Sequence, residues 1–118
     1  MPVSQSDTGV SGVGGGDLAA TTLTDIYTAP SIQKNSVKYA KTLFICNRSA
    51  SPVTFRVAYA PLGAADAVDQ YLMYDVVLAA NDTFTMDMQG IRLNPTDVIR
   101  VFSSSGDVTA TLFVDSRP

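Results

Sequence analysis

Apolar and polar residues alternate in short segments from residue 21 to residue 114, and turn residues separate these segments. Alternation with a period of two predicts strands that bury one face and expose the other. The clearest examples are Val53–Tyr59, in which the odd positions are apolar or aromatic, and Thr83–Met88, in which the even positions are. No segment has the period and length of a helix, so the pattern predicts an all-β chain.

About seven or eight strands follow one another at intervals of about ten residues. The predicted strands are Thr21–Thr28, Val37–Asn47, Val53–Tyr59, Gln70–Leu78, Thr83–Met88 with a short continuation at Ile91–Leu93, Asp97–Phe102 and Asp107–Val114. Leu23 and Ile26 are out of phase in the first strand, which predicts a bulge. Because no crossover helices are present, the fold expected is an antiparallel β-sandwich or jelly roll.

Residues 1–16 differ in composition from the rest of the chain and contain five of its eight glycines. Such a segment buries too little apolar area to offset its ordering entropy, so we expect a flexible N-terminal arm followed by a single domain over residues 17–118. The arm either orders on a neighbouring subunit or is a loose tail. Its candidate docking residues are Val10, Gly12, Val13, Gly14, Gly15 and Gly16.

Several predicted strands carry apolar residues on the face that should point away from the core. These candidates for a subunit interface are Phe44, Cys46, Tyr71, Met73, Val77, Phe102 and Phe113. In Gln70–Leu78 this assignment directs Leu72, Tyr74 and Val76 toward the core. Either other segments of the chain or a neighbouring subunit must cover the outward side chains, since full burial of one is worth about 1.5–3 kcal/mol. Subunit contact is favoured because Tyr and Met are enriched in interface cores.

The composition offers little material for catalysis. The chain has no histidine, all eleven acidic residues are aspartate, and Cys46 is the single cysteine, which we expect to act as a small hydrophobe. A cysteine nucleophile of the usual kind needs a histidine base. The spacing of Asp66, Asp69 and Asp75 does not match a calcium loop. We therefore expect no enzymatic activity, no cofactor and no metal.

The charge balance narrows the choice of partners. The net charge is -3 and the eight basic residues are scattered, so nucleic acid is not expected as a partner. No apolar run is long enough for a membrane-spanning helix. Charged residues make up 16% of the chain, against about a quarter in typical soluble domains, which favours a surface that meets other subunits. Without a signal-peptide pattern, the sequons at Asn47 and Asn81 are expected to be chance matches.

Four segments, in this order, carry a family resemblance: TTLTDIYTAP, TLFICNRSASPVTFRVAYAP, QYLMYDVVLAANDTFTM and GIRLNPTDVIRVFSSSGDVTATLFV. Together they cover about residues 21–114, and the chain resembles a family of small bacteriophage virion proteins. The matching positions are Leu23, Tyr27, Pro30, Cys46, Asn47, Ser49, Phe55, Arg56, Val57, Tyr71, Leu72, Tyr74, Asp75 and 79–84. Thr96-Asp97 stands where the family often has Gly-Asp, and residues 31–36 depart from its glycine-basic turn.

The resemblance implies a structural part of the virion and brings no catalytic residues with it. Its small members with an N-terminal arm resemble capsid cement (decoration) proteins, which bind and stabilise the assembled shell. We therefore expect a homo-oligomer, a trimer, that contacts the major capsid protein or other virion proteins in particles assembled in the bacterial cytoplasm. The alternative is a tail, neck or fibre-associated adaptor, or a carbohydrate-binding module for the host receptor.

Overall fold

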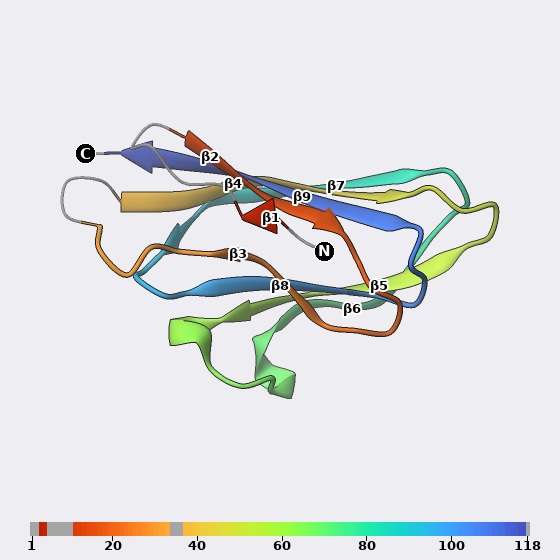
Figure 1. Ribbon diagram of the computed structural model, residues 1–118, viewed down its shortest axis with the longest axis horizontal. Coiled ribbons are helices and arrows are strands. Elements are labelled where there is room, and N and C mark those ends of the chain that lie inside the picture. The colour runs from red at the N-terminus through yellow and green to blue at the C-terminus, as the bar shows by residue number, and fades with distance from the viewer. Residues whose placement is uncertain (1–2, 5–10, 34–36, 118) are drawn as a thin grey trace.

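The computed structural model describes residues 3–4, 11–33 and 37–117, which form two antiparallel sheets packed face to face (Figure 1). The strands of this part of the chain are β1 (Val3–Ser4), β2 (Ser11–Asp17), β3 (Thr24–Thr28), β4 (Val37–Asn47), β5 (Val53–Ala60), β6 (Tyr71–Leu78), β7 (Thr83–Leu93), β8 (Val98–Ser103) and β9 (Val108–Arg117). Two short 3₁₀ turns, η1 (Pro61–Gly63) and η2 (Val68–Gln70), lie between β5 and β6. The predicted all-β sandwich is confirmed.

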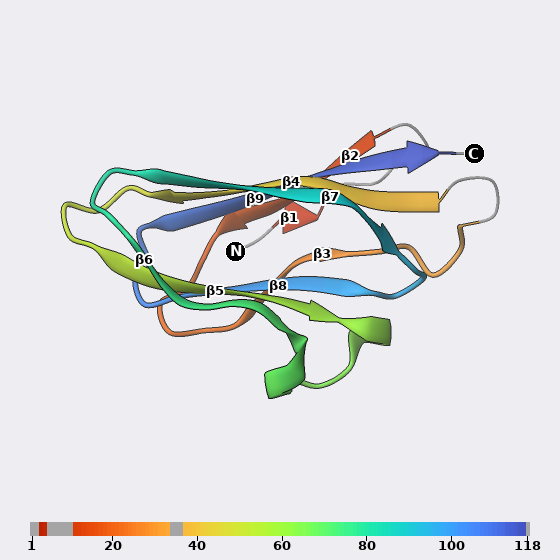
Figure 2. The same ribbon diagram turned by 180° about the vertical axis from the view of Figure 1, so that it is seen from behind.

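The strand order identifies the kind of sandwich. One sheet runs β1-β2-β9-β4-β7 and the other β3-β8-β5-β6. Apart from the short β1, eight strands thus divide into two four-stranded layers, and consecutive strands repeatedly cross between the layers, as Figure 2 shows from behind. This arrangement of two interleaved Greek keys is a jelly roll.

The core lies between the two sheets and consists of the alternating positions that the sequence predicts. Leu43 and Ile45 of β4, Phe55 and Val57 of β5, and Leu112 of β9 are fully buried. The predicted inward residues of β7 also meet this core, since Met88 is buried and Phe84 and Met86 pack against it. The bulge predicted near Leu23 and Ile26 occurs as a register shift between Asp25 and Tyr27.

Strand β7 is longer than predicted. The Gln89-Gly90 break does not end the strand, which continues to Leu93. Gln89 and Gly90 both have positive φ, and the register with β4 shifts between Ala40 and Thr42 at the same level. The break is therefore a bulge inside one strand, which bends the strand without ending its pairing.

The N-terminal segment does not match the predicted boundary at residue 16. Ser11–Asp17 form strand β2, which pairs with β9 of the same chain from Ser11–Asp115 to Asp17–Thr109. The backbone of the predicted arm residues 12–16 is therefore held in its own sheet, and Val10 lies outside the described residues. The glycine content that suggested flexibility has a different cause.

Gly15 shows this cause, because its backbone lies too close to β9 for any side chain. A Cβ atom at this position would lie 2.0 Å from the carbonyl oxygen of Ala110, and Gly15 has a φ of +142°. Only glycine combines this backbone conformation with so close an approach.

We predict that Gly15→Ala destabilises the fold by roughly 1–3 kcal/mol, because the methyl group forces β2 away from β9. Chemical denaturation measures the free energy of unfolding, and hydrogen exchange of β9 amides reports the pairing. Gly106→Ala is the matched control, since its Cβ would meet nothing nearer than 3.9 Å and should cost less than about 0.5 kcal/mol. Equal stability of the two variants would contradict this account of β2.

Asn47 joins the two turns at one end of the sandwich. Its side-chain NH₂ group donates to the carbonyl oxygens of Ser51 (2.9 Å), Ala79 (3.1 Å) and Leu78 (3.3 Å). Its carbonyl oxygen accepts hydrogen bonds from the N–H (3.0 Å) and hydroxyl (2.7 Å) of Ser49. Asn47 is fully buried, so its sequon is inaccessible and the residue has a structural role.

We predict that Asn47→Asp lowers the free energy of unfolding by about 2–4 kcal/mol, because a buried carboxylate would face three carbonyl oxygens with no N–H to offer them. Thermal or chemical denaturation measures the loss. Asn81→Asp is the matched control: Asn81 is exposed and has a φ of +57°, which aspartate also tolerates. If both variants lost the same stability, the Asn47 network would not be what joins the turns.

Candidate functional site

The outer face of the five-stranded sheet carries an exposed aromatic pair. Phe44 of β4 and Phe113 of β9 meet edge to face, with ring centroids 5.7 Å apart and an interplanar angle of 89°. Phe113 is 42% exposed and Phe44 is half-buried. Because both rings point away from the core, their apolar area is available to a partner.

Small, uncharged side chains surround this pair. Phe44 lies between Thr85 of β7 and Thr111 of β9, and the next row places the half-buried Cys46 between Thr83 and Thr109. The thiol therefore lies on the outer face and not in the core. Charged groups enter these rows only at their ends, where Asp17 pairs with Thr109 and Asp87 pairs with Thr42 beside Phe113, so the centre of this face is threonine and phenylalanine.

An arginine lies between two aromatic rings on the outer face of the four-stranded sheet. The Arg56 guanidinium lies 4.2 Å from the centroid of the Tyr74 ring and 4.4 Å from that of Phe102. Asp75 accepts two hydrogen bonds from Arg56, at 2.6 and 3.3 Å. The charge is thus neutralised within the cluster, and stacked Arg and Tyr side chains are the types most often dominant in protein interfaces.

Tyr71 extends the cluster toward the β5–β6 loop. Its ring meets Tyr74 edge to face at 5.1 Å. Burial, followed by a hydrogen bond to Asp66, raises the pKa of Tyr71 above its ordinary value. Strand β6 and the loop therefore present one connected surface.

The predicted facing of β6 is wrong in its central part. Met73 and Val76 pack against the core, whereas Leu72, Tyr74 and Val77 are exposed. The register with β5 shifts between Phe55 and Val57 and again between Val57 and Ala58, and Asp75 has a φ of +51°. These irregularities change which residues face inward, so Met73 does not belong with the outward-facing candidates.

The other six candidates lie outside the core but do not form one patch. Phe44, Cys46 and Phe113 lie on the five-stranded sheet, whereas Tyr71, Val77 and Phe102 lie on the four-stranded sheet. The structure therefore separates them onto opposite faces of the sandwich. Sequence reasoning missed exposed Leu62 and Val68 of the β5–β6 loop, although apolar residues in a predicted loop were the available signal.

A buried carboxylate fixes the start of this loop. Asp97 accepts hydrogen bonds from the Leu62 N–H (2.8 Å), the Asn94 N–H (2.8 Å) and the Tyr59 hydroxyl. Leu62 is held with φ +54° and ψ +26°, in the left-handed region that residues other than glycine rarely occupy. The position that resembles the family's Gly-Asp thus supplies a structural acceptor.

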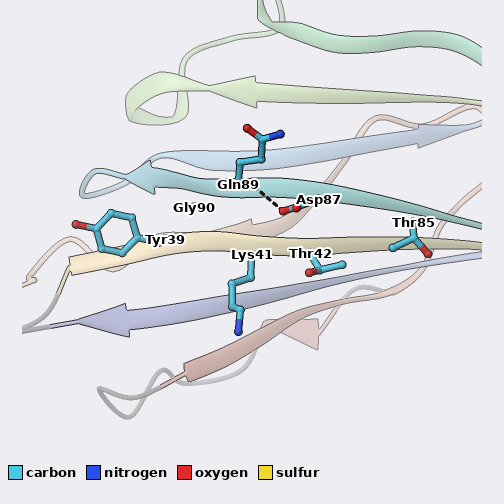
Figure 3. Close-up of a pocket in the computed structure, with 7 residues that line it drawn as sticks. All are labelled: Tyr39, Lys41, Thr42, Thr85, Asp87, Gln89 and Gly90. Carbon is cyan, nitrogen blue, oxygen red and sulfur yellow. Dashed lines mark hydrogen bonds between the residues drawn. The ribbon is translucent and has the colours of Figure 1, made fainter.

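A polar groove of about 610 Å³ lies between β4 and β7 at the level of their bulges (Figure 3). Its lining residues are Tyr39, Lys41, Thr42, Thr85, Asp87, Gln89 and Gly90. The Gln89 N–H donates to Asp87 at 2.8 Å, and in Figure 3 the Lys41 and Gln89 side chains extend in opposite directions from their strands. The groove is continuous with the Phe44–Phe113 face through Thr42, which pairs with Phe113.

Within 3–4, 11–33 and 37–117, no three or more His, Cys, Asp or Glu side chains are grouped as a metal ion requires. In the same part of the chain no helix has the length and apolar character needed to cross a membrane.

Comparison with solved structures includes a weak likeness to a viral protein chain. No protein-family model and no curated protein sequence matches the chain. A solved chain described as "Structure of infectious bursal disease virus Gx strain" is 11% identical, with a TM-score of 0.45. The match covers 97% of this chain and 31% of that one, so the present chain spans about a third of its length. A likeness at this level supports no argument about function.

Tyr59 gives a pH-dependent test of the Asp97 site. Burial, and then the hydrogen bond to Asp97, raise the pKa of Tyr59 to about 12. Because the unfolded value is about 10, the stabilisation is complete below pH 10 and is lost as the pH rises through about 12. We predict that Tyr59→Phe lowers the free energy of unfolding by about 1.5–3 kcal/mol at neutral pH. When the pH is raised above 10, the free energy of unfolding should fall less for Tyr59→Phe than for the wild type. Parallel urea unfolding at both pH values measures this, and identical pH profiles would contradict it.

Proposed function

We propose that the protein is a structural component of a bacteriophage virion and acts through contacts with its own copies and with other virion proteins. Two independent features support this proposal. The ordered segments between residues 21 and 114 resemble small phage virion proteins. The jelly roll is also a fold that viral capsids use repeatedly, which is support by analogy alone.

The observation that carries the proposal is the position of apolar and aromatic side chains outside a core that is already filled. Phe113 on one face is 42% exposed, and Val77 on the other is 68% exposed. The described segments cover neither face completely. A protein with two such faces can bridge two neighbours, and binding to the assembled state stabilises that state by mass action.

The finer assignment that we propose is a capsid cement protein that forms a trimer on the shell. Self-association is assigned to the five-stranded face, because the exposed Phe44–Phe113 pair lies among threonines and the charges in its rows, Asp17 and Asp87, lie at the ends of those rows. Contacts with the major capsid protein are assigned to the other side of the sandwich. The proposed activity is binding alone, without catalysis or a cofactor.

A host-receptor module of the tail or fibre is the second candidate, and one observation favours it. The exposed Tyr74 ring lies beside the polar Asp75 and Arg56 side chains, a combination that can stack on a sugar and donate to its hydroxyls. The guanidinium already covers one side of the Tyr74 ring, so only the other side is open to a sugar.

Binding to particles tests the virion role. Purified protein is mixed with particles of the encoding phage that lack it, and its copy number is measured together with the temperature at which the shells open. We expect saturation at hundreds of copies and a higher opening temperature. A dozen copies or fewer would place the protein in the tail or neck, and no binding would remove the virion role.

Self-association is tested without particles. We predict that the wild type sediments as a multiple of its 12.5 kDa chain, and that Phe113→Asp sediments as a monomer because a charge enters the apolar face. Val77→Asp is the control on the opposite face and should leave the oligomer intact, with folding of both variants checked by circular dichroism. A monomeric wild type, or dissociation only by Val77→Asp, would contradict the assigned face.

A further inference from the structure

Exposed apolar side chains are concentrated in one stretch of the chain. Among the described residues, seven large apolar side chains are exposed, and five of them lie between residues 62 and 77. These five are Leu62, Val68, Leu72, Tyr74 and Val77. They occupy the β5–β6 loop, which projects from the four-stranded sheet on the side away from the other sheet (Figures 1 and 2), and β6, which is an edge strand of the four-stranded sheet.

The same stretch is acidic. Residues 57–78 contain Asp66, Asp69 and Asp75 and no lysine or arginine. Asp75 is paired with Arg56, which precedes the stretch, but Asp66 and Asp69 lie in the loop beside the exposed apolar groups. Two copies of this surface would repel each other, whereas a basic partner would be attracted.

The loop is held in one conformation although all its residues from 61 to 69 are exposed. Arg100 donates to the carbonyl oxygen of Ala64 at 2.7 Å, and Gln70 donates to that of Ala65 at 2.9 Å. Asp97 fixes Leu62 at its other end. These partners lie in β8, immediately before β8 and at the end of η2, so the loop needs little ordering when it binds.

The backbone of Leu62 has an unfavourable conformation that burial of its side chain does not offset. A left-handed backbone is unfavourable for leucine, and its side chain is 73% exposed, so it gains little by burial in this chain. Neighbouring groups hold this exposed apolar residue in a strained backbone conformation. Such strain points toward a binding role.

We infer that the β5–β6 loop and the outer face of β6 form a docking surface for a second, different virion protein, which presents an apolar cleft rimmed by lysine and arginine. Leu62 and Val68 enter the cleft, and Asp66 and Asp69 face its basic rim. This inference rests on the proposed virion function and adds the surface used and the chemistry of its partner.

The test measures the affinity of variants for particles of the encoding phage that lack this protein. Leu62→Asn removes the apolar side chain and suits the left-handed backbone, so its melting temperature should equal or exceed that of the wild type. We expect its affinity to fall at least tenfold. Ile32→Asn, an equally exposed apolar residue in another loop, should bind as the wild type does.

The charge component has its own readout. Wild-type affinity should decrease with rising salt, and Asp69→Asn should weaken this dependence. If the wild type binds and Leu62→Asn binds equally well, the inference is wrong but the proposed function stands. If Leu62→Asn changes the oligomeric state, the inference is also wrong, because the occupant of the surface is then a second copy of this chain. Failure of the wild type to bind would overturn both the proposed function and this inference.

Discussion

The apolar packing between the two sheets is the constraint on which the rest of the structure depends. The inward positions of β4, β5, β8 and β9 are fully buried by one another, so the interior has no place for further side chains. Apolar residues in excess of this interior must lie outside it. The two aromatic faces are therefore a consequence of filling a small sandwich with a chain that is 46% hydrophobic.

Strict alternation made most of the fold predictable. Where a strand keeps its period, as β5 does from Val53 to Val57, the inward residues follow directly from the sequence. The prediction failed in β6, because a positive φ at Asp75 and two register shifts depend on pairing with β5, which a linear pattern does not contain. It failed again at Ser11–Asp17, because a glycine-rich strand and a glycine-rich linker have the same composition until the approach of β9 is known.

The candidate surfaces were predictable only as single residues. The sequence indicated that Phe44, Phe113 and Phe102 point outward, but their division between opposite faces follows from the strand order. The stacking of Arg56 on Tyr74 and Phe102 joins three strands that are distant along the chain. The role of Asp97 needed the folded structure as well, because two of its three donors, Tyr59 and Leu62, are distant from it along the chain.

The pairing of β2 with β9 has a consequence for synthesis of the chain. Strand β2, the first long strand to be synthesised, pairs with β9, which ends at Arg117, and β4 also pairs with β9. Neither pairing can form until β9 has been made. During translation both strands therefore have unsatisfied edges. The five-stranded layer can therefore be completed only after β9 has been made, and its many pairings between distant residues make this step slow.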